Sequence, residues 1–539
     1  MPASLASASE NGWFRVHARR KVMLMDSGLP FDLSVLERAR LSRDSRFDGK
    51  FFIAVTSTGI YCRPVCPAAP SATTGHTRYF ASAAAAHEAG FRPCLRCRPE
   101  AAPGTPAWTG TSAVVRRALR LIEDGALDEQ TVSEFAAHLG LGPRHLDRLF
   151  AQHVGASPLA IAQTRRLHFA KRLIDESDLP MTEVALAAGF GSLRRFNDVL
   201  RKTYGMPPRE LRKRRDEQPT GGAAGEVRLT LAYRAPYDWD HLREFLGQRA
   251  IAGVEKVDAL SYTRLIRTAD GHAEIGIRPL PGRSALELRV HGAPAGALFQ
   301  IASAARRVFD LSGDPDRVAQ TLGADRLLRP LVERRPGLRI PGAWDPFECA
   351  VRAVLGQQIT VAAARTLAAR LVQRLGRPAA GTQGLTHLFP APQALAAGNL
   401  DGLGLTGARI RALKALAGAV AEGRIAFDRP AGAVMESLKG LPGFGEWTAQ
   451  YIALRSLGEP DALPGADLVL RRMAGNGKGP LSTKEMERRA DLWRPWRSYA
   501  VMHLWCAAGE PRAQEAATPR SACGASCAKD AARVRKHKS

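Results

Sequence analysis

Two close pairs of cysteines lie near the N-terminus of this 539-residue chain. Cys62 and Cys66 are separated by three residues, Cys94 and Cys97 by two, and 27 residues lie between the pairs. Pairs with this spacing can place four thiolates around one tetrahedral Zn²⁺, which holds a small domain together. Basic residues flank both pairs and would draw a polyanion towards the metal. The sequence therefore predicts one small zinc domain, in which the metal is either structural alone or also makes a thiolate reactive.

The charge balance indicates the kind of partner. The chain has 77 Lys and Arg against 52 Asp and Glu, a formal net charge of +25. An excess of this size favours nucleic acid, ahead of an anionic membrane. No stretch approaches the roughly 18 apolar residues of a membrane span, and the N-terminus has no apolar signal region. We therefore expect a cytoplasmic, nucleoid-associated protein that binds double-stranded DNA.

The apolar pattern changes several times along the chain, which predicts a multidomain α+β protein. Alternating runs predict strands at 51–55, 227–233, 262–267, 273–277 and 285–290, while an Ala-rich stretch predicts a helix at 82–89. We expect these parts in order: a disordered N-terminus at 1–30, a small zinc α/β domain at 31–103, an all-α domain at 113–216, an antiparallel β-rich α+β domain at 226–320, an all-α domain at 340–508 and a disordered basic tail at 509–539.

Two similar segments lie within the first all-α domain. Residues 131–150 and 181–196 each contain an Ala-centred helix, a Gly turn and a second helix with arginine near its start. An ordinary helical bundle is the plain alternative, but the doubled pattern resembles the AraC/XylS-type DNA-binding domain. That resemblance implies a double helix-turn-helix whose second helices enter two major grooves. The residues it places there are Arg144, His145, Arg148, Ser192, Arg194, Arg195 and Asn197.

The segments around the cysteines, 58–66 and 89–99, resemble the metal-binding domain of the Ada family of adaptive-response regulators. The resemblance implies that Cys62 accepts a methyl group from a DNA methylphosphotriester while Cys62, Cys66, Cys94 and Cys97 hold one zinc ion. A thiolate kept ionised by zinc can attack a methyl group whose leaving group is a phosphodiester anion. Methylation removes one negative charge and so reduces repulsion of DNA. The Pro-Cys-His-Arg motif of that family's second methyltransferase is absent, so we expect no repair of O6-methylguanine.

A third pattern lies in the C-terminal all-α domain. The sequence LPGFG at 441–445 lies between two predicted helices, and its glycines, Gly443 and Gly445, let backbone N–H groups approach a DNA phosphate. Asp467 follows, and tryptophans recur at 493–505. Alone, such a turn with a nearby aspartate is weak evidence. Together with the preceding sheet, the set resembles 3-methyladenine DNA glycosylase II of the helix-hairpin-helix superfamily.

This resemblance implies roles for several residues. Asp467 is the catalytic carboxylate, which stabilises positive charge on the sugar or activates water. Trp447, Tyr451 and Trp505 form an aromatic pocket that binds a flipped, cationic alkylated purine by cation–π attraction. Trp496 is expected in the core instead. Trp447 also occupies the place of the nucleophilic lysine of bifunctional relatives, which predicts a monofunctional enzyme that uses water.

The resemblance also places Gln358 where some relatives insert an apolar wedge into the duplex, and Gln357 beside it is expected to bind DNA. Zinc is the one cofactor expected, because Cys506, Cys523 and Cys527 have the wrong spacing for an iron–sulfur cluster. A second hypothesis makes the chain a methylation-activated transcription factor whose glycosylase half only holds DNA. In either case we expect a monomer that binds alkylated and operator DNA and contacts RNA polymerase.

Overall fold

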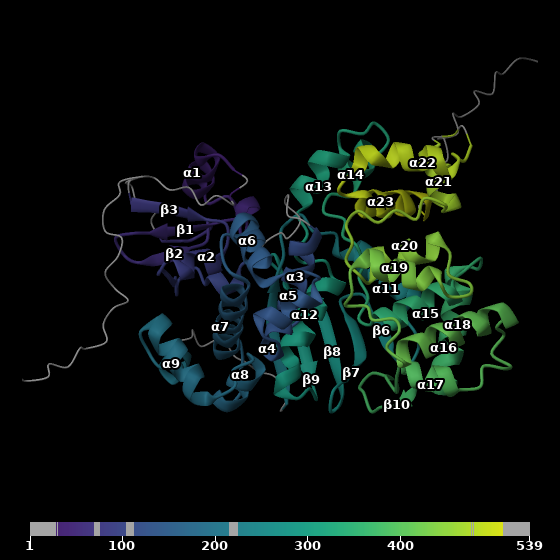
Figure 1. Cartoon of the computed structure of the whole chain (residues 1–539), viewed down its shortest axis with the longest axis horizontal. Coiled ribbons are helices and arrows are strands. Elements are labelled where there is room, and N and C mark those ends of the chain that lie inside the picture. Colours follow the sequence, from purple (N-terminus) through teal and green to yellow (C-terminus); the bar gives the residue numbers. More distant parts are fainter. Residues whose placement is uncertain are drawn as a thin grey trace, which may run out of the picture.

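The computed structural model describes residues 29, 31–68, 76–103, 113–214, 225–475, 477 and 479–509. It has the predicted multidomain α+β class, with the N-terminal domains (purple and blue) on one side and the C-terminal domains (teal to yellow) on the other (Figure 1). Apart from residues 29 and 509, the segments predicted to be disordered, 1–30 and 509–539, lie outside the described residues. None of the described helices combines the length and the apolar character that a membrane span requires.

The four-cysteine domain contains a four-stranded sheet in the order β3-β1-β2-β4. Its elements are α1 (Leu33–Ser42), η1 (Ser45–Phe47), β1 (Phe52–Val55), β2 (Ile60–Cys62), β3 (Thr77–Phe80), α2 (Ala83–Glu88), β4 (Arg92–Pro93) and η3 (Pro99–Ala101). The strand and helix predicted at 51–55 and 82–89 are thereby confirmed. Strands β2 and β4 run parallel and pair Tyr61 with Pro93. This register brings Cys62, at the end of β2, beside Cys94, which directly follows β4.

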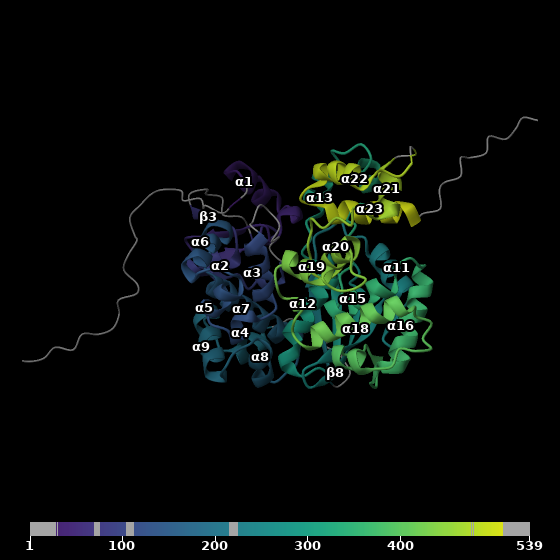
Figure 2. The same cartoon turned by 45° about the vertical axis from the view of Figure 1, so that its right-hand side comes forward.

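The next domain is the predicted double helix-turn-helix. Its helices are α3 (Ala113–Glu123), α4 (Ala126–Glu129), α5 (Val132–His138), α6 (Pro143–Val154), α7 (Pro158–Glu176), α8 (Met181–Ala187), α9 (Leu193–Tyr204) and α10 (Pro208–Lys213). A capping box of Thr131 and Glu134 starts α5, and Gly155 in the left-handed conformation ends α6. The long helix α7 joins the two units, and these helices form one stack beside the C-terminal domains (Figure 2).

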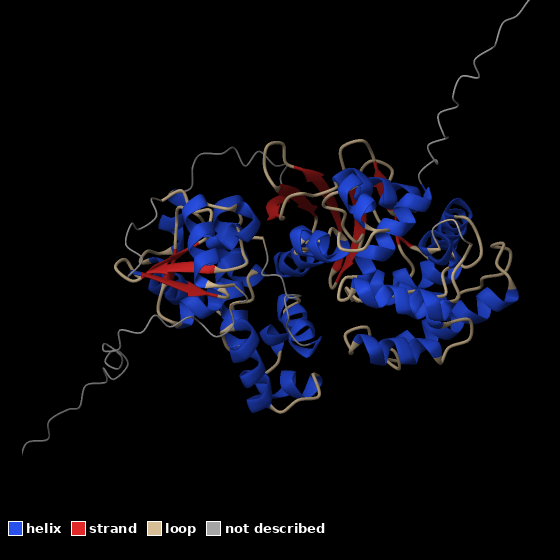
Figure 3. Ribbon diagram, turned by 90° about the horizontal axis from the view of Figure 1, so that it is seen from above, coloured by secondary structure: helices blue, strands red, loops and turns tan. Residues whose placement is uncertain are grey.

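The sheet domain follows, with five antiparallel strands in the order β5-β9-β8-β7-β6. Strands are drawn in red and helices in blue in Figure 3, which shows the molecule from above. Its elements are β5 (Glu226–Ala232), α11 (Trp239–Arg249), β6 (Glu255–Val257), β7 (Tyr262–Thr268), β8 (Gly271–Pro279), β9 (Ala285–His291), η4 (Ala295–Ala297), α12 (Leu298–Val308), α13 (Pro315–Leu322) and α14 (Arg329–Arg334). The four predicted strands are confirmed, and alternate side chains of β5 are buried, as its pattern predicted. The short strand β6 and the helix α11 were not predicted.

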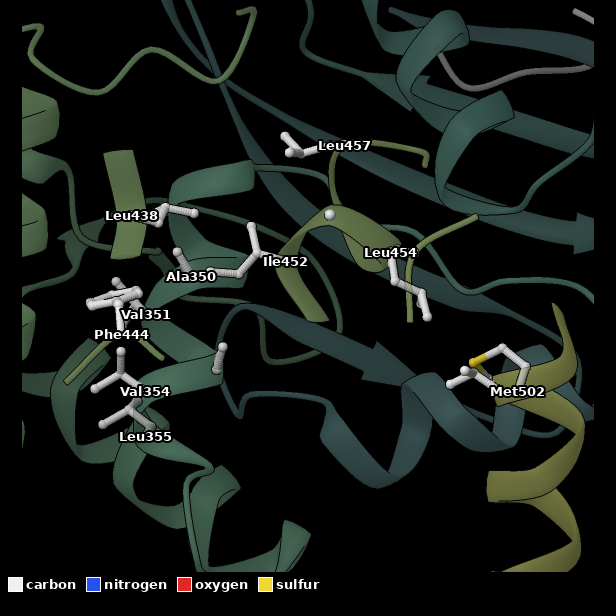
Figure 4. Close-up of a cluster of buried hydrophobic side chains, with 14 of the residues drawn as sticks. Ala350, Val351, Val354, Leu355, Leu438, Phe444, Ile452, Leu454, Leu457 and Met502 are labelled. Atoms are coloured by element: carbon white, nitrogen blue, oxygen red, sulfur yellow. The ribbon is translucent and has the colours of Figure 1, made fainter. Parts of the chain in front are cut away.

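The C-terminal helical domain contains α15 (Pro346–Leu355), α16 (Val361–Leu375), β10 (Arg377–Pro378), β11 (His387–Leu388), α17 (Pro392–Ala397), α18 (Gly407–Ala421), α19 (Ala431–Lys439), α20 (Glu446–Arg455), α21 (Leu468–Ala474), α22 (Thr483–Ala490), η5 (Asp491–Trp493) and α23 (Arg497–Gly509). Val351, Leu438, Phe444 and Ile452 pack together beneath the α19–α20 hairpin (Figure 4). Trp496 is only 3% exposed and lies against Tyr499, as expected of a core residue.

Buried contacts connect the domains. Helices α7–α10 share one hydrophobic cluster with the sheet domain, where the rings of Phe169 and Phe299 lie 4.9 Å apart. Helix α3 contacts the C-terminal helical domain, because Arg117 donates to the Asp428 carbonyl at 2.8 Å and Arg120 to the Leu457 carbonyl. The described domains therefore pack as one body.

Candidate active sites and DNA interface

The four cysteines form a metal-binding cluster. Their Sγ atoms all lie within 4.8 Å of one another. A tetrahedron with Zn–S bonds of about 2.3 Å needs sulfur atoms about 3.8 Å apart, so this donor set fits one zinc ion. Cys94 and Cys97 are buried, whereas Cys62 and Cys66 are partly exposed. A hydrogen bond with Cys62 lowers the pKa of the Cys66 thiol to about 7. The cluster thus presents Cys62 on its accessible side.

The residues on either side of Cys62 are fixed by contacts. The Tyr61 hydroxyl lies 2.9 Å from Nε2 of His168 on α7. Burial lowers the pKa of His168 to about 3, so that imidazole is neutral. On the other side, the Arg63 backbone N–H donates to Cys97 Sγ at 3.4 Å and its guanidinium to the Cys97 carbonyl at 3.1 Å. Arg63 therefore holds the second cysteine pair against the first.

The predicted groove-facing residues lie on α6 and α9. Arg144, His145, Arg148, Arg194 and Arg195 are exposed there. Within the described residues these arginine side chains make no ion pair, so they are available to DNA. The two other predicted residues, Ser192 and Asn197, have different surroundings.

Ser192 and Asn197 are less free to contact a base. The Ser192 hydroxyl caps α9 by accepting from the Arg195 N–H at 3.2 Å, and Asn197 is half-buried. Helix capping occupies one lone pair of the Ser192 oxygen and leaves its proton able to reach a phosphate.

The C-terminal helical domain brings Asp467 together with the predicted aromatic residues. Asp467 caps α21, and its carboxylate accepts from the Leu470 N–H at 2.9 Å. The Trp447 indole donates to Oδ2 at 2.9 Å, and the Trp505 indole reaches Oδ1 at 3.4 Å. Tyr451 stacks on Trp447 with ring centroids 5.4 Å apart. These residues line a cavity of about 480 Å³, which can hold a flipped base.

The same cavity has a wall that the sequence did not predict. Phe245 and Arg249 from α11 line it, together with Arg455 from α20. The Arg249 and Arg455 guanidinium carbons lie 3.7 and 4.6 Å from the Phe245 ring centroid. Burial lowers the pKa of Arg249 to about 10, which leaves it charged at neutral pH. No motif marks α11, and only its position after the first strand of the sheet could have suggested a contribution.

The predicted hairpin lies at the edge of this site. Gly443 has φ +82°, and an added Cβ would lie 3.0 Å from the Ala412 side chain, so the turn requires glycine. An added Cβ on Gly445 would meet no atom within 4 Å, which leaves that backbone open to DNA. The Gln357 amide donates to the Gly443 carbonyl at 2.9 Å and to Thr448 Oγ1 at 3.0 Å. Gln357 therefore contacts the hairpin itself.

Gln358 has a different environment from its neighbour. It is exposed and has a left-handed backbone, with φ +56°, in the turn between α15 and α16. The Arg409 guanidinium donates to the Gln357 carbonyl and fixes this turn. A non-glycine residue in this conformation carries strain that the surrounding contacts must hold.

Four charged residues form another part of the cavity wall. Arg264 and Arg352 pair with Glu255 and Glu348, and Arg264 Nη1 lies 2.7 Å from Glu255 Oε1. Desolvation raises the pKa of Glu255, but the two guanidinium groups outweigh it and bring the pKa down to about 2. This group joins β6 and β7 of the sheet domain to α15.

Comparison with known proteins places these sites in families. Four family models match: the metal binding domain of Ada at 36–100, a helix-turn-helix domain at 135–214, the AlkA N-terminal domain at 228–345 and the HhH-GPD superfamily of base excision DNA repair proteins at 351–498. A probable bifunctional transcriptional activator/DNA repair enzyme AlkA of Mycobacterium tuberculosis (strain H37Rv) is 42% identical over 482 residues, which are 88% of this chain and 96% of that protein.

Two further relatives each match one part of the chain. The DNA-3-methyladenine glycosylase 2 of Escherichia coli is 35% identical over 286 residues, which are 52% of this chain and 97% of that protein. The bifunctional transcriptional activator/DNA repair enzyme Ada of the same organism is 33% identical over 192 residues, which are 36% of this chain and 50% of that protein.

Proposed function

Because this chain belongs to the family of bifunctional transcriptional activator/DNA repair enzymes, we propose that it excises alkylated purines and also senses methylated DNA. The excision is that of a monofunctional 3-methyladenine DNA glycosylase, which hydrolyses the N-glycosidic bond. One observation carries this proposal. The Asp467 carboxylate is held by two indole N–H groups and a helix N-terminus at the mouth of an aromatic cavity.

The geometry supports a hydrolytic mechanism. A flipped base stacks against Trp447 and Tyr451, while Asp467 stabilises the positive charge that develops on the sugar. The C1′–N bond breaks with its electron pair moving to the base, a water oxygen bonds to C1′, and the water proton leaves through Asp467. Arg249 and Arg455 place positive charge near these rings, so the carboxylate must offset it for a cationic base. An abasic site remains.

The four-cysteine domain supplies the sensor of this proposal. Zinc, when bound, keeps the four sulfur atoms ionised at neutral pH. The partly exposed Cys62 sulfur attacks the methyl carbon of a methylphosphotriester, the S–C bond forms, the C–O bond breaks, and the phosphodiester leaves with the electron pair. The cluster then carries one negative charge fewer, so DNA phosphate is repelled less. Helices α6 and α9 bind the operator, and the bound monomer contacts RNA polymerase.

The two glutamines of the turn between α15 and α16, Gln357 and Gln358, have separate roles in this proposal. Gln358, exposed and left-handed, fills the gap that the flipped base leaves in the duplex. Gln357 acts as a positioning residue, because its amide holds the hairpin of Gly443 in place through two hydrogen bonds. The hairpin glycines approach the DNA phosphate through their backbone.

The test of excision is Asp467→Asn, which keeps the shape of the side chain and removes its charge. We expect release of 3-methyladenine from alkylated duplex DNA to fall by about 100-fold or more, while binding of abasic-site DNA persists. Asp491→Asn is the matched control, because Asp491 is exposed outside the cavity and, among the described residues, forms an ion pair with Arg494 alone. Undiminished release by the Asp467 variant would favour the second hypothesis, a transcription factor whose C-terminal half only holds DNA.

The test of sensing is Cys62→Ser. After incubation with duplex DNA that carries methylphosphotriesters, the wild-type peptide containing Cys62 gains the mass of one methyl group, and the variant peptide does not. Base release by the variant remains, because Cys62 lies outside the cavity of Asp467. A methyl group found on another cysteine, with Cys62 unmodified, contradicts the assignment.

A further inference from the structure

A polar contact connects the four-cysteine domain to the sheet domain, and Asp48 lies at its centre. The Arg63 Nε donates to Asp48 Oδ1 at 2.8 Å, while Arg234 of the sheet domain donates to the Asp48 carbonyl at 3.2 Å. Asp48 is 6% exposed and Arg234 only 3%. Arg63 is the residue next to Cys62. The path of contacts from Cys62, the proposed methyl acceptor, to Arg234 of the glycosylase half therefore passes through two residues, Arg63 and Asp48.

A second ion pair strengthens this contact. Lys50 Nζ lies 2.9 Å from Asp314 Oδ1, and the Asp314 side chain is fully buried. Arg234 also donates to the Ser312 carbonyl at 3.1 Å. An added Cβ on Gly49, which has φ +73°, would lie 2.1 Å from the Pro103 carbonyl oxygen. These segments are in direct contact, so a shift of Asp48 must move its partners.

The loop that receives the contact also touches α23, the helix that supplies Trp505 to the base-binding cavity. Residues 310–314 include Ser312 and Asp314, which contact Arg234 and Lys50. At the other end of the loop, Asp310 accepts from the Tyr499 hydroxyl at 2.7 Å. Tyr499 lies on α23, the helix that carries Trp505 of the cavity. The 310–314 loop thus touches the four-cysteine domain and the helix of the catalytic site.

The other neighbour of Cys62 reaches the regulatory half. Tyr61 contacts His168 on α7, the helix that joins the two helix-turn-helix units. The two residues next to Cys62 therefore contact different halves of the molecule: Tyr61 contacts the helix-turn-helix domain, and Arg63 is connected through Asp48 to the sheet domain. Modification of one atom can bias both contacts if each has an alternative arrangement.

We propose that methylation of Cys62 loosens the contact between Arg63, Asp48 and Arg234 and so transmits the methylation state to the 310–314 loop of the glycosylase half. This inference rests on the proposed role of Cys62 as methyl acceptor. The methyl group adds volume beside the Arg63 backbone. The Arg63 backbone N–H donates to Cys97 Sγ at 3.4 Å, so Arg63 moves when the added methyl group displaces the sulfur atoms of the cluster. Arg63 then shifts, and its pairing with Asp48 weakens.

Hydrogen–deuterium exchange on the full-length, zinc-loaded chain tests the proposal. The protein is incubated with duplex DNA carrying methylphosphotriesters, freed of DNA at high salt, and compared with untreated protein. We expect peptides covering 232–236 and 310–314 to exchange roughly tenfold faster after methylation, as for loss of one charged hydrogen bond. Helix α18 serves as the internal reference. Cys62→Ser, treated identically, should show no change.

A matched pair of variants tests the route. Asp48→Asn keeps the carbonyl contact with Arg234 but removes the charge that binds Arg63, so its 310–314 loop should exchange equally fast in both states. Asp44→Asn changes a carboxylate on the same segment whose hydrogen bonds, among the described residues, go to Arg46, and it should keep the methylation response. The Cys62 peptide mass is measured in each sample.

The outcomes separate the two claims. An unmodified Cys62 overturns the sensor function and with it this inference. A methylated Cys62 with unchanged exchange at 310–314 overturns the inference alone, and so does a full response in Asp48→Asn.

Discussion

At the scale of single residues, the Asp467 carboxylate depends on its donors. Trp447→Phe keeps an aromatic ring beside Tyr451 but removes the indole N–H that donates to the Asp467 carboxylate at 2.9 Å. A hydrogen bond to a charged group contributes about 1.5–3 kcal/mol, so we expect the single-turnover rate of 3-methyladenine release to fall by about tenfold or more.

Trp505→Phe is the matched comparison for that change. It removes a second donor to the same carboxylate, but from 3.4 Å, so its loss should be smaller. Both rates are measured with the same alkylated duplex at saturating enzyme. Equal losses, or a larger loss for Trp505→Phe, would contradict the idea that the Trp447 donor orients Asp467.

The four charged residues of the cavity wall, Glu255, Arg264, Glu348 and Arg352, predict that the free energy of unfolding depends on pH. The pKa of Glu255 lies at about 2, below its ordinary value of 4.5. Its charged form therefore stabilises the fold above pH 4.5, and this stabilisation is lost as the pH falls through 2. At neutral pH, Glu255→Gln should lower the free energy of unfolding by about 3 kcal/mol, because it leaves Arg264 and Arg352 with Glu348 as their one carboxylate partner among the described residues.

Calorimetry of wild type and Glu255→Gln from pH 7 to pH 3 measures this effect. The difference in thermal midpoint should be largest near neutral pH and narrow below pH 4.5. Glu226→Gln provides the control, since within the described part of the chain Glu226 pairs with one partly exposed arginine, Arg228. A difference between wild type and Glu255→Gln that is constant with pH would exclude the charge of Glu255 as its cause.

The sequence predicted part of this site and missed the rest for a physical reason. Asp467, Trp447 and Trp505 belong to recognisable motifs, and the structure brings them within hydrogen-bonding distance. Phe245 and Arg249 come from a helix about two hundred residues earlier, whose pattern resembles any amphipathic helix. Only the packing of α11 against α16 and α20 places their side chains in the cavity.

At the scale of elements, the α15–α16 turn and the α19–α20 hairpin act together through Gln357. Gln357→Leu removes both hydrogen bonds to the hairpin, at Gly443 and Thr448, without touching Asp467. We expect the Kd for abasic-site DNA to rise about tenfold, because a flexible hairpin orders on binding at an entropic cost.

Fluorescence anisotropy with a labelled abasic-site duplex measures this Kd. Gln393→Leu is the control, since Gln393 is exposed on α17 of the same domain. If the two variants bind with the same Kd, Gln357 does not brace the hairpin.

Elements differ in how far their sequence defines them. The strands β5, β8 and β9 alternate apolar and polar residues along most of their length, and this pattern was sufficient to predict them. Strand β7 was predicted as well, although its first four residues are all buried and do not alternate. Strand β6 has only three residues, too few for any period. The parallel pairing of β2 with β4 joins segments about thirty residues apart, with Cys62 at the end of β2 and Cys94 directly after β4, and no periodic pattern marks it in the sequence.

At the scale of the whole molecule, the domains share their interiors. The second helix-turn-helix unit and the sheet domain have one hydrophobic cluster, although a charged and glycine-rich segment separates them in the sequence. Such a segment predicts a flexible connection between two domains. It gives no information about which faces of the two domains pack against each other. The contact of Asp48 with Arg63 and Arg234 could not be predicted from the sequence either, because isolated polar residues that are far apart in the chain form no periodic pattern.

The four-cysteine domain depends most on its metal. Its interior consists of two small clusters, around Tyr61 and around Phe51, while one large cluster fills the C-terminal helical domain. A small core does not offset the conformational entropy of its chain, so bound zinc supplies much of the folding free energy. Removal of zinc by a chelator should therefore unfold residues 31–103 and leave 225–509 folded.

Limited proteolysis with trypsin, followed by mass spectrometry, measures this difference. With chelator, we expect cleavage within 31–103 at least about tenfold faster, whereas base release from alkylated DNA continues. Added Zn²⁺ should restore resistance, which excludes damage by the chelator itself. Loss of base release together with zinc would mean that the two halves fold as a single cooperative unit. Continued release with a cleaved N-terminal domain would show that Asp467 and its cavity need no support from the metal.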